Sequence, residues 1–214
     1  MKILLKLLVL LISTSVFSQT KLEYLKNNRL DISKNNFTFP QSNFNIVGFG
    51  AYHGSQKTED VELNIFKSIL KKTPIKFYLP ETDFSIAHYF NVYLKTGDTI
   101  LLKDLVTQYG IRVPQERTIE VYNKWKKLKK INDNLPQKEK IQIVGIDLQV
   151  NNKYVSKHIL EIVKNPNNQF SILNEINEMV KIDSTSYSTK STSYSSKLLM
   201  KFVSVYKINS VIYE

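Results

Sequence analysis

The stretch of residues 44–59 reads FNIVGFGAYHGSQKTE, and the predicted fold of the chain depends on it. Its first six residues form a short apolar run, which is typical of a strand that is buried on both faces. Glycines at 48, 50 and 54 then surround His53, and a helical pattern begins near Thr58. Glycine gives a turn backbone conformations that are closed to other residues, and it lets a ligand come close. We therefore expect His53 at the carboxyl end of a strand, where open α/β sheets bind ligands.

Apolar runs and helical patterns alternate along the rest of the chain. Residues 75–79 and 141–146 resemble two further strands. Apolar side chains at intervals of three to four residues predict helices, which cover residues 58–73, 84–96, 98–110, 114–134, 152–164 and 169–182. Alternating strands and helices are typical of a parallel sheet with helices on both faces. The predicted fold is α/β, with three α/β/α layers and a mainly parallel sheet.

The first 18 residues have the layout of a secretory signal peptide. Lys2 and Lys6 precede an apolar run at residues 7–12, and small residues follow up to a cleavage point before Gln19. A membrane anchor is the alternative, but this run is short for crossing a bilayer. We therefore expect a secreted or periplasmic protein that has no stable membrane span once the signal is removed.

The remainder of the chain is predicted to contain a lead-in and one domain. Residues 19–43 are polar and rich in asparagine, whereas residues 44–182 carry the predicted α/β domain. Residues 183–197 form a linker rich in Ser, Thr and Tyr. The apolar segment 198–214 fits a helix or a strand, and we assign it to the same domain.

Charge and cysteine content limit the classes of partner. The chain carries a net charge of +11 and has no cysteine, which excludes disulfides and lipid attachment at a cysteine. The positive charge suits nucleic acid or an anionic surface, but a diffuse lysine-rich surface explains it more simply. The lysines of residues 124–130 stand near the end of a predicted helix, where cations complement the helix dipole. We predict a small-molecule substrate or ligand and no nucleic acid.

Ionisable side chains follow each predicted strand. His53 follows the first, Glu81 and Asp83 follow the second, and Asp147 follows the third. The carboxyl ends of parallel strands lie on one edge of a sheet, so these side chains are expected to share a crevice. A histidine can take a proton from water, and a carboxylate beside it can orient the ring or the water. The sequence predicts His53 and Glu81 as the catalytic residues.

The same side chains also have structural explanations. His53 can be a hydrogen-bonded core residue, and Asp83 or Asp147 can cap the helix that follows it. Whether Asp83 and Asp147 take part in the chemistry or cap a helix, we predict that both support the site.

Three other residues complete the predicted site or its alternatives. Ser55 follows Gly54 at the turn, and Arg117 is predicted to bind an anion or a carboxylate near the start of a helix. His88 could share a metal with His53 and Glu81, but no HExxH-like spacing supports this. We expect no cofactor and keep a metal as the alternative.

Several short segments, in order, carry a family resemblance. They are GFGAYHGS at residues 48–55, PETD at 80–83 and VGIDLQ at 144–149, with Trp125 and Asn132 between the last two. These segments resemble motifs of the erythromycin esterase-like family. The resemblance implies an α/β fold and hydrolysis of an ester, such as a macrolide lactone. It also implies that His53 is the base that activates water and that Glu81 holds or polarises this water.

Two features depart from that family. Ala51 and Tyr52 stand where the family has an acidic residue just before the histidine. The family's members are longer and carry a further catalytic histidine, whereas only His88 and His158 follow here. The resemblance therefore implies either a domain that is incomplete at its C-terminus or a scaffold with changed activity. The alternative is a non-catalytic relative that binds haem, a metal or another small ligand in the same crevice.

Overall fold

The computed structural model describes residues 20–32, 37–40, 44–50, 52, 55–110, 114–149, 152–163, 171–182 and 194–210. The chain divides into two units, Met1–Phe37 and Thr38–Glu214. In the first unit, α2 (Lys21–Asn28) opens with a capping box between Thr20 and Glu23. None of the residues of α2 is buried, so the apolar core of the described residues lies in the second unit.

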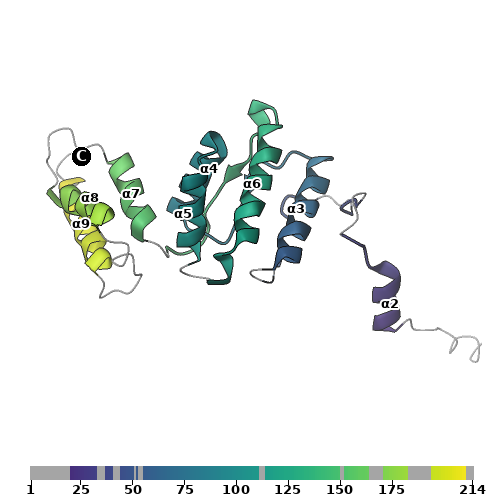
Figure 1. The fold of residues 1–214 in the computed structure, drawn as a ribbon. Coiled ribbons are helices and arrows are strands. Elements are labelled where there is room, and N and C mark those ends of the chain that lie inside the picture. Colours follow the sequence, from purple (N-terminus) through teal and green to yellow (C-terminus); the bar gives the residue numbers. More distant parts are fainter. Residues whose placement is uncertain are drawn as a thin grey trace, which may run out of the picture. The chain divides into compact units, whose positions relative to one another are not determined.

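The second unit is mainly helical in its described residues (Figure 1). Its helices are α3 (Gln56–Leu70), α4 (Phe84–Thr96), α5 (Thr99–Tyr109), α6 (Ile119–Asp133), α7 (Asn152–Ile162), α8 (Ser171–Ile182) and α9 (Tyr194–Ser210), and its 3-10 turns are η1 (Pro114–Glu116) and η2 (Gln137–Glu139). Two short strands, β1 (Phe77–Tyr78) and β2 (Gln142–Ile143), pair in parallel. Helices α4, α5 and α6 form the crossover between these strands.

The predicted three-layer α/β/α fold with a mainly parallel sheet is wrong. Two of the predicted strands form, as β1 and β2, but residues 44–50 contain no strand. Ile46 in this segment is 87% exposed. A Cβ at Gly48 or Gly50 would meet nothing within 4 Å, so none of the described residues packs against these glycines. Glycine weakens a strand, and an apolar run without a pairing partner does not form one.

Asparagine side chains occupy the outer edge of β2. The amide of Asn91 in α4 donates to the Ile143 carbonyl, and its oxygen accepts from the Ile143 amide, both at 2.8 Å. The side chain of Asn132 in α6 accepts from the amide of Ile141 at 2.8 Å. A further strand would need these same backbone groups. The two asparagines therefore end the sheet at β2.

Local sequence signals account for most helix ends. Asp83 accepts a hydrogen bond from an amide in the first turn of α4, as predicted, and Asp98 caps α5 in the same way. Gly97 ends α4 in the left-handed conformation, with a φ of 75°. The start of α3 differs from the prediction: the helix follows Ser55 and does not begin at Thr58.

The predicted terminal segments are described only in part. α9 begins inside the predicted linker of residues 183–197 and continues to Ser210 within the segment 198–214, which was predicted as a helix or a strand. Residues 183–193 lie outside the described residues, as does the predicted signal peptide. No helix in the described ranges is long and apolar enough to cross a membrane.

Two apolar clusters hold the second unit together. The larger lies among α3, α4, α5, α6 and the strands, where Trp125 stacks on Phe90 with 3.7 Å between ring centroids. The smaller joins α8 and α9 around Ile176, and side chains of α7 pack against it. Tyr154 of α7 belongs to the larger cluster, and α7 packs against both α4 and α8. Helix α7 therefore links the two clusters.

Candidate functional site

The segments that follow β1 and β2 are joined by backbone contacts. The carbonyl of Thr82 accepts hydrogen bonds from the amides of Ile146 and Asp147 at 3.0 and 3.1 Å. Gly145 lies against the chain at Asp83, because a Cβ at this glycine would stand 2.2 Å from the Asp83 carbonyl oxygen. Only glycine allows so close an approach. Two segments far apart in the sequence therefore meet at one junction, which we call the strand-end junction.

Three of the predicted acids lie at the strand-end junction. Asp83 is only 2% exposed, and its carboxylate accepts from the Ile86 amide at 2.9 Å, so it caps α4. Asp147 is half-buried, and its carboxylate accepts from the Leu148 amide at 2.7 Å. Glu81 is exposed in the turn after β1. The structure thus brings Glu81, Asp83 and Asp147 to the same end of the strand pair.

A serine and a histidine on facing helices lie beside this junction. Ser85 in the first turn of α4 and His158 in α7 are both buried, and Ser85 Oγ lies 3.1 Å from His158 Nδ1. Phe84 and His88 stack on the imidazole of His158 at centroid distances of 5.5 and 4.1 Å. Burial, together with the neighbouring His88, lowers the pKa of His158. The ring is therefore neutral at pH 7, and it can donate or accept a hydrogen bond.

Glu161 near the end of α7 contacts two residues of α4. His88 Nε2 lies 3.1 Å from one carboxylate oxygen, and the Tyr89 hydroxyl donates to the other at 2.6 Å. Burial and this hydrogen bond raise the pKa of Tyr89, so its hydroxyl keeps its proton. In the described part of the chain, no group of three or more His, Cys, Asp or Glu side chains is arranged to hold a metal ion.

The other predicted site residues are not placed at the strand-end junction. His53 lies outside the described residues. Ser55 is half-buried and directly precedes α3. Arg117 is exposed after η1, where its amide donates to the Pro114 carbonyl and its backbone lies against Gly110. Neither of these residues belongs to the junction.

Sequence reasoning missed the pair formed by Ser85 and His158. Ser85, His88 and Tyr89 recur at intervals of three and four residues on α4, and His158 and Glu161 are three apart on α7. Such spacing indicates a polar stripe on each helix. The spacing does not reveal that these two helices pack against each other, which the structure shows.

Comparisons of the chain with models of protein families, with curated proteins and with solved structures gave no match. The resemblance of its motifs to the erythromycin esterase-like family therefore stays a prediction.

Proposed function

We propose that the protein hydrolyses an ester or a lactone at the carboxyl ends of β1 and β2. One observation supports this most directly. The Thr82 carbonyl accepts from two amides that follow β2, and this junction gathers Glu81, Asp83 and Asp147. Ligands of parallel sheets bind at this end of the strands. Carboxylates gathered there can orient a histidine and a water molecule.

The proposed reaction needs a base and a positioned water. The base takes a proton from water while the water oxygen attacks the carbonyl carbon of the ester. The bond from that carbon to the alcohol oxygen then breaks, and the base returns the proton to the departing alcohol. On the family resemblance we assign the base to His53 and the orienting carboxylate to Glu81, whose exposure leaves it accessible to a substrate.

Asp83 and Asp147 act in this proposal as positioning residues. Each carboxylate already accepts a backbone amide, from Ile86 in one case and from Leu148 in the other. These hydrogen bonds hold the start of α4 and the end of the β2 segment in place. Glu81 directly precedes Thr82, whose carbonyl belongs to this junction, and its side chain is exposed.

The same hydrogen bonds favour a second function, in which the junction binds a small ligand without hydrolysing it. One oxygen of each of these two carboxylates is committed to the backbone, which leaves fewer acidic oxygens for proton transfer. Ala51 also favours binding without hydrolysis, because the erythromycin esterase-like family has an acidic residue just before the histidine. The ligand is then haem, a metal or another small molecule.

Hydrolysis of p-nitrophenyl esters and of macrolide lactones separates the two functions. We expect His53→Ala and Glu81→Gln each to lower kcat/KM by about a hundredfold or more. Glu139→Gln is the matched control, because Glu139 lies in η2 outside the strand-end junction, and it should keep the wild-type rate. Full activity in His53→Ala or Glu81→Gln contradicts the hydrolase. Thermal stabilisation by a ligand, without cleavage of any ester, supports the binding function instead.

A further inference from the structure

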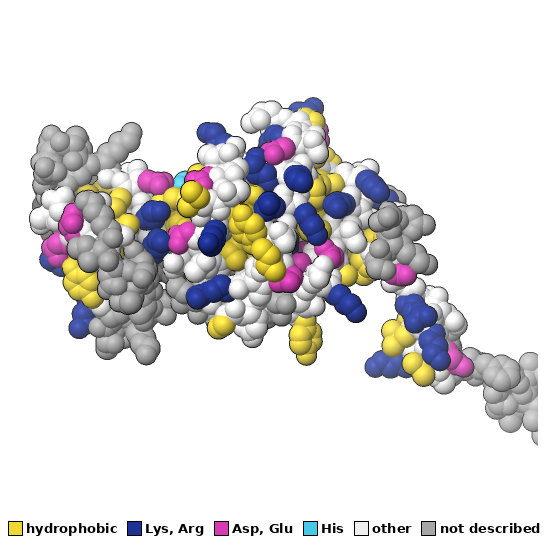
Figure 2. Space-filling model, in the orientation of Figure 1, with side chains coloured by type: hydrophobic (Ala, Val, Ile, Leu, Met, Phe, Trp, Pro, Cys, Tyr) yellow, Lys and Arg dark blue, Asp and Glu magenta, His cyan; other side chains and the backbone are white. Residues whose placement is uncertain are grey.

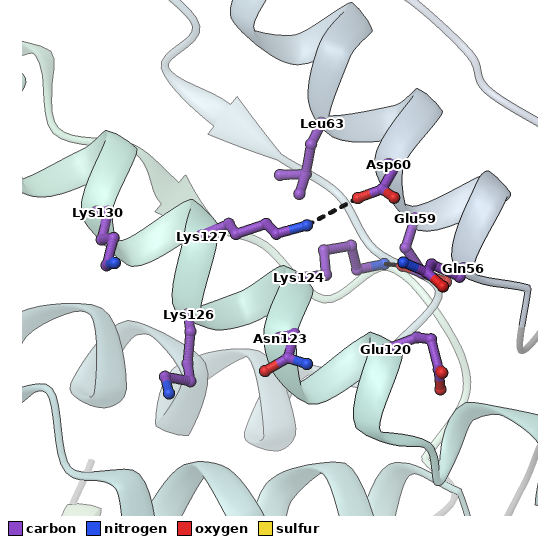
Figure 3. A pocket seen from close by; sticks show the side chains of 10 residues that line it. All are labelled: Gln56, Glu59, Asp60, Leu63, Glu120, Asn123, Lys124, Lys126, Lys127 and Lys130. Carbon is purple, nitrogen blue, oxygen red and sulfur yellow. Dashed lines mark hydrogen bonds and ion pairs between the residues drawn. The ribbon is translucent and has the colours of Figure 1, made fainter. Parts of the chain in front are cut away.

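Basic side chains gather over α6 and its border with α3 in the orientation of Figure 1 (Figure 2). A pocket of about 280 Å³ lies between these two helices, and Figure 3 shows its lining. From α3 the lining includes Gln56 and Asp60, and from α6 it includes three exposed lysines. The residues of the strand-end junction do not line it. The pocket is therefore a separate place on the second unit.

A network of ion pairs between α3 and α6 forms one wall of this pocket. Lys124 Nζ lies 2.6 Å from a carboxylate oxygen of Glu59 and 3.0 Å from one of Glu62, which also accepts from the Tyr78 hydroxyl. Burial lowers the pKa of Lys124, but the acidic groups around its amine outweigh burial and raise the pKa well above its ordinary value. Lys124 is therefore a permanent cation that is committed to its own chain, and it is not available to a ligand.

Two lysines at the rim of the pocket, Lys126 and Lys130, which we call the rim lysines, carry the positive charge that lies outside the ion pairs of Lys124 and Lys127. Lys127 extends from α6 to Asp60 of α3, with 2.7 Å between the charged atoms, and both side chains are about half exposed (Figure 3). Lys126 lies over the ring of Tyr122, 5.5 Å from its centroid. Lys130 is exposed.

The dipole of α6 explains only part of this charge. Cations complement a helix dipole within the last turn, and α6 ends at Asp133. Lys130 falls in that turn, whereas Lys126 and Lys127 lie almost two turns before the end of the helix. The dipole therefore does not account for these two lysines. Lys127 pairs with Asp60 of α3, whereas Lys126 lines the concave surface.

We propose that this pocket binds a small phosphate ester that carries several hydroxyl groups, of the size of a phosphorylated monosaccharide. The rim lysines neutralise the phosphate, which Lys binds as a point charge. Glu120, Asn123 and Gln56 also line the pocket and offer donors and acceptors to hydroxyl groups. On the α3 side, Glu59 and Asp60 are neutralised by Lys124 and Lys127, so the phosphate end of the ligand is expected near the rim lysines. The volume lies near the lower limit of about 300 Å³ for small-molecule sites.

Titration of the full chain with glucose 6-phosphate tests this proposal, with calorimetry for affinity and amide NMR shifts for location. Glucose and inorganic phosphate are titrated separately at the same ionic strength. We expect glucose 6-phosphate to bind at least tenfold more tightly than either glucose or inorganic phosphate. The shifted amides are expected in residues 56–63 of α3 and 120–130 of α6.

A double variant, Lys126→Gln/Lys130→Gln, removes rim charge but keeps the ion pairs of Lys124 and Lys127, so the two helices stay joined. We expect it to bind glucose 6-phosphate at least tenfold more weakly than the wild type. Lys103→Gln, which removes an exposed lysine of α5 outside the pocket, should bind as the wild type does. Equal affinity in the double variant and the control overturns the proposal, and so does inorganic phosphate that binds as tightly as the sugar phosphate. Neither result bears on ester hydrolysis, because this pocket does not depend on the proposed function.

Discussion

Gly145 lies directly against the backbone of Asp83, so that a Cβ on the glycine would stand 2.2 Å from the aspartate's carbonyl oxygen. This contact connects the segment after β2 with the start of α4. The adjacent carbonyl of Thr82 accepts two amides from the same segment. The strand pair, the cap of α4 and the candidate site therefore share one backbone junction, and a change in it is expected to affect all three.

Replacing Gly145 by alanine is expected to lower the free energy of unfolding by about 1–3 kcal/mol, because the added methyl group forces the backbone apart. Gly48→Ala is the matched control, since a Cβ there meets nothing within 4 Å. Its effect should stay within about 0.5 kcal/mol. Urea denaturation followed by circular dichroism measures both variants. Equal stabilities would contradict the close approach of Gly145 to Asp83.

The role of Asn91 at the sheet edge predicts a loss of stability. Asn91→Ala leaves the amide and the carbonyl of Ile143 without their side-chain partners, and Ile143 is only 2% exposed. We expect a cost of about 2–4 kcal/mol for Asn91→Ala. Asn91→Asp should also lose stability, because its carboxylate keeps the acceptor but turns an oxygen toward the Ile143 carbonyl. Asn123→Ala on the exposed side of α6 is the control. If Asn91→Ala costs no more than this control, the side chain does not close the edge of β2.

The buried and the exposed ion pairs between α3 and α6 should respond differently to removal of the cation. Lys124→Met leaves Glu59 and Glu62 without their cation in a buried place, and a loss of about 3–5 kcal/mol is expected. Lys127→Met breaks only the exposed pair with Asp60 and should cost less than about 1 kcal/mol. Urea denaturation of the two variants gives the comparison. Similar losses for both lysines would show that burial does not distinguish these pairs.

The environment of His158 predicts a pH dependence of stability. The pKa of this histidine is lowered in the folded protein from its ordinary value of 6.5, by burial and by His88. The unfolded chain therefore binds a proton more readily, so this contribution to stability is complete above pH 6.5 and is lost as the pH falls below it. We expect His158→Gln to lose less stability than the wild type between about pH 7.5 and about pH 5. NMR titration of the imidazole provides a direct check, and a midpoint at or above 6.5 would refute the assignment.

The helix ends were predictable because both partners of a cap lie within a few residues. Asp83 and Asp98 accept amides from the turn that follows them, and Gly97 adopts a conformation that glycine favours. The strand predicted at residues 44–49 does not form, because strand formation depends on residues that are distant in the sequence. A strand depends on a partner elsewhere in the chain, and in this structure Asn91 and Asn132 take the edge of β2 where such a partner could have paired.

The candidate site also contains features that were predicted from the sequence and features that were not. Acids after the predicted strands were identified from the sequence, and three of them meet at the strand-end junction. The pair of Ser85 and His158 was not identified, because the two residues belong to different helices and are 73 positions apart in the sequence. Spacing within one helix reveals which side chains share a face, but it does not identify the helix that this face contacts.

The sequence by itself determined the helices α3 to α8, apart from their exact ends, and the acids that begin α4 and α5, because apolar spacing and hydrogen bonds within one turn decide these features. Only the tertiary structure decided that His158 lies against Ser85, that Lys124 lies between Glu59 and Glu62, and that the sheet stops at β2. These relationships depend on which helices pack together. That choice results from many small apolar contacts summed over the whole core, and no local pattern of residues contains the sum.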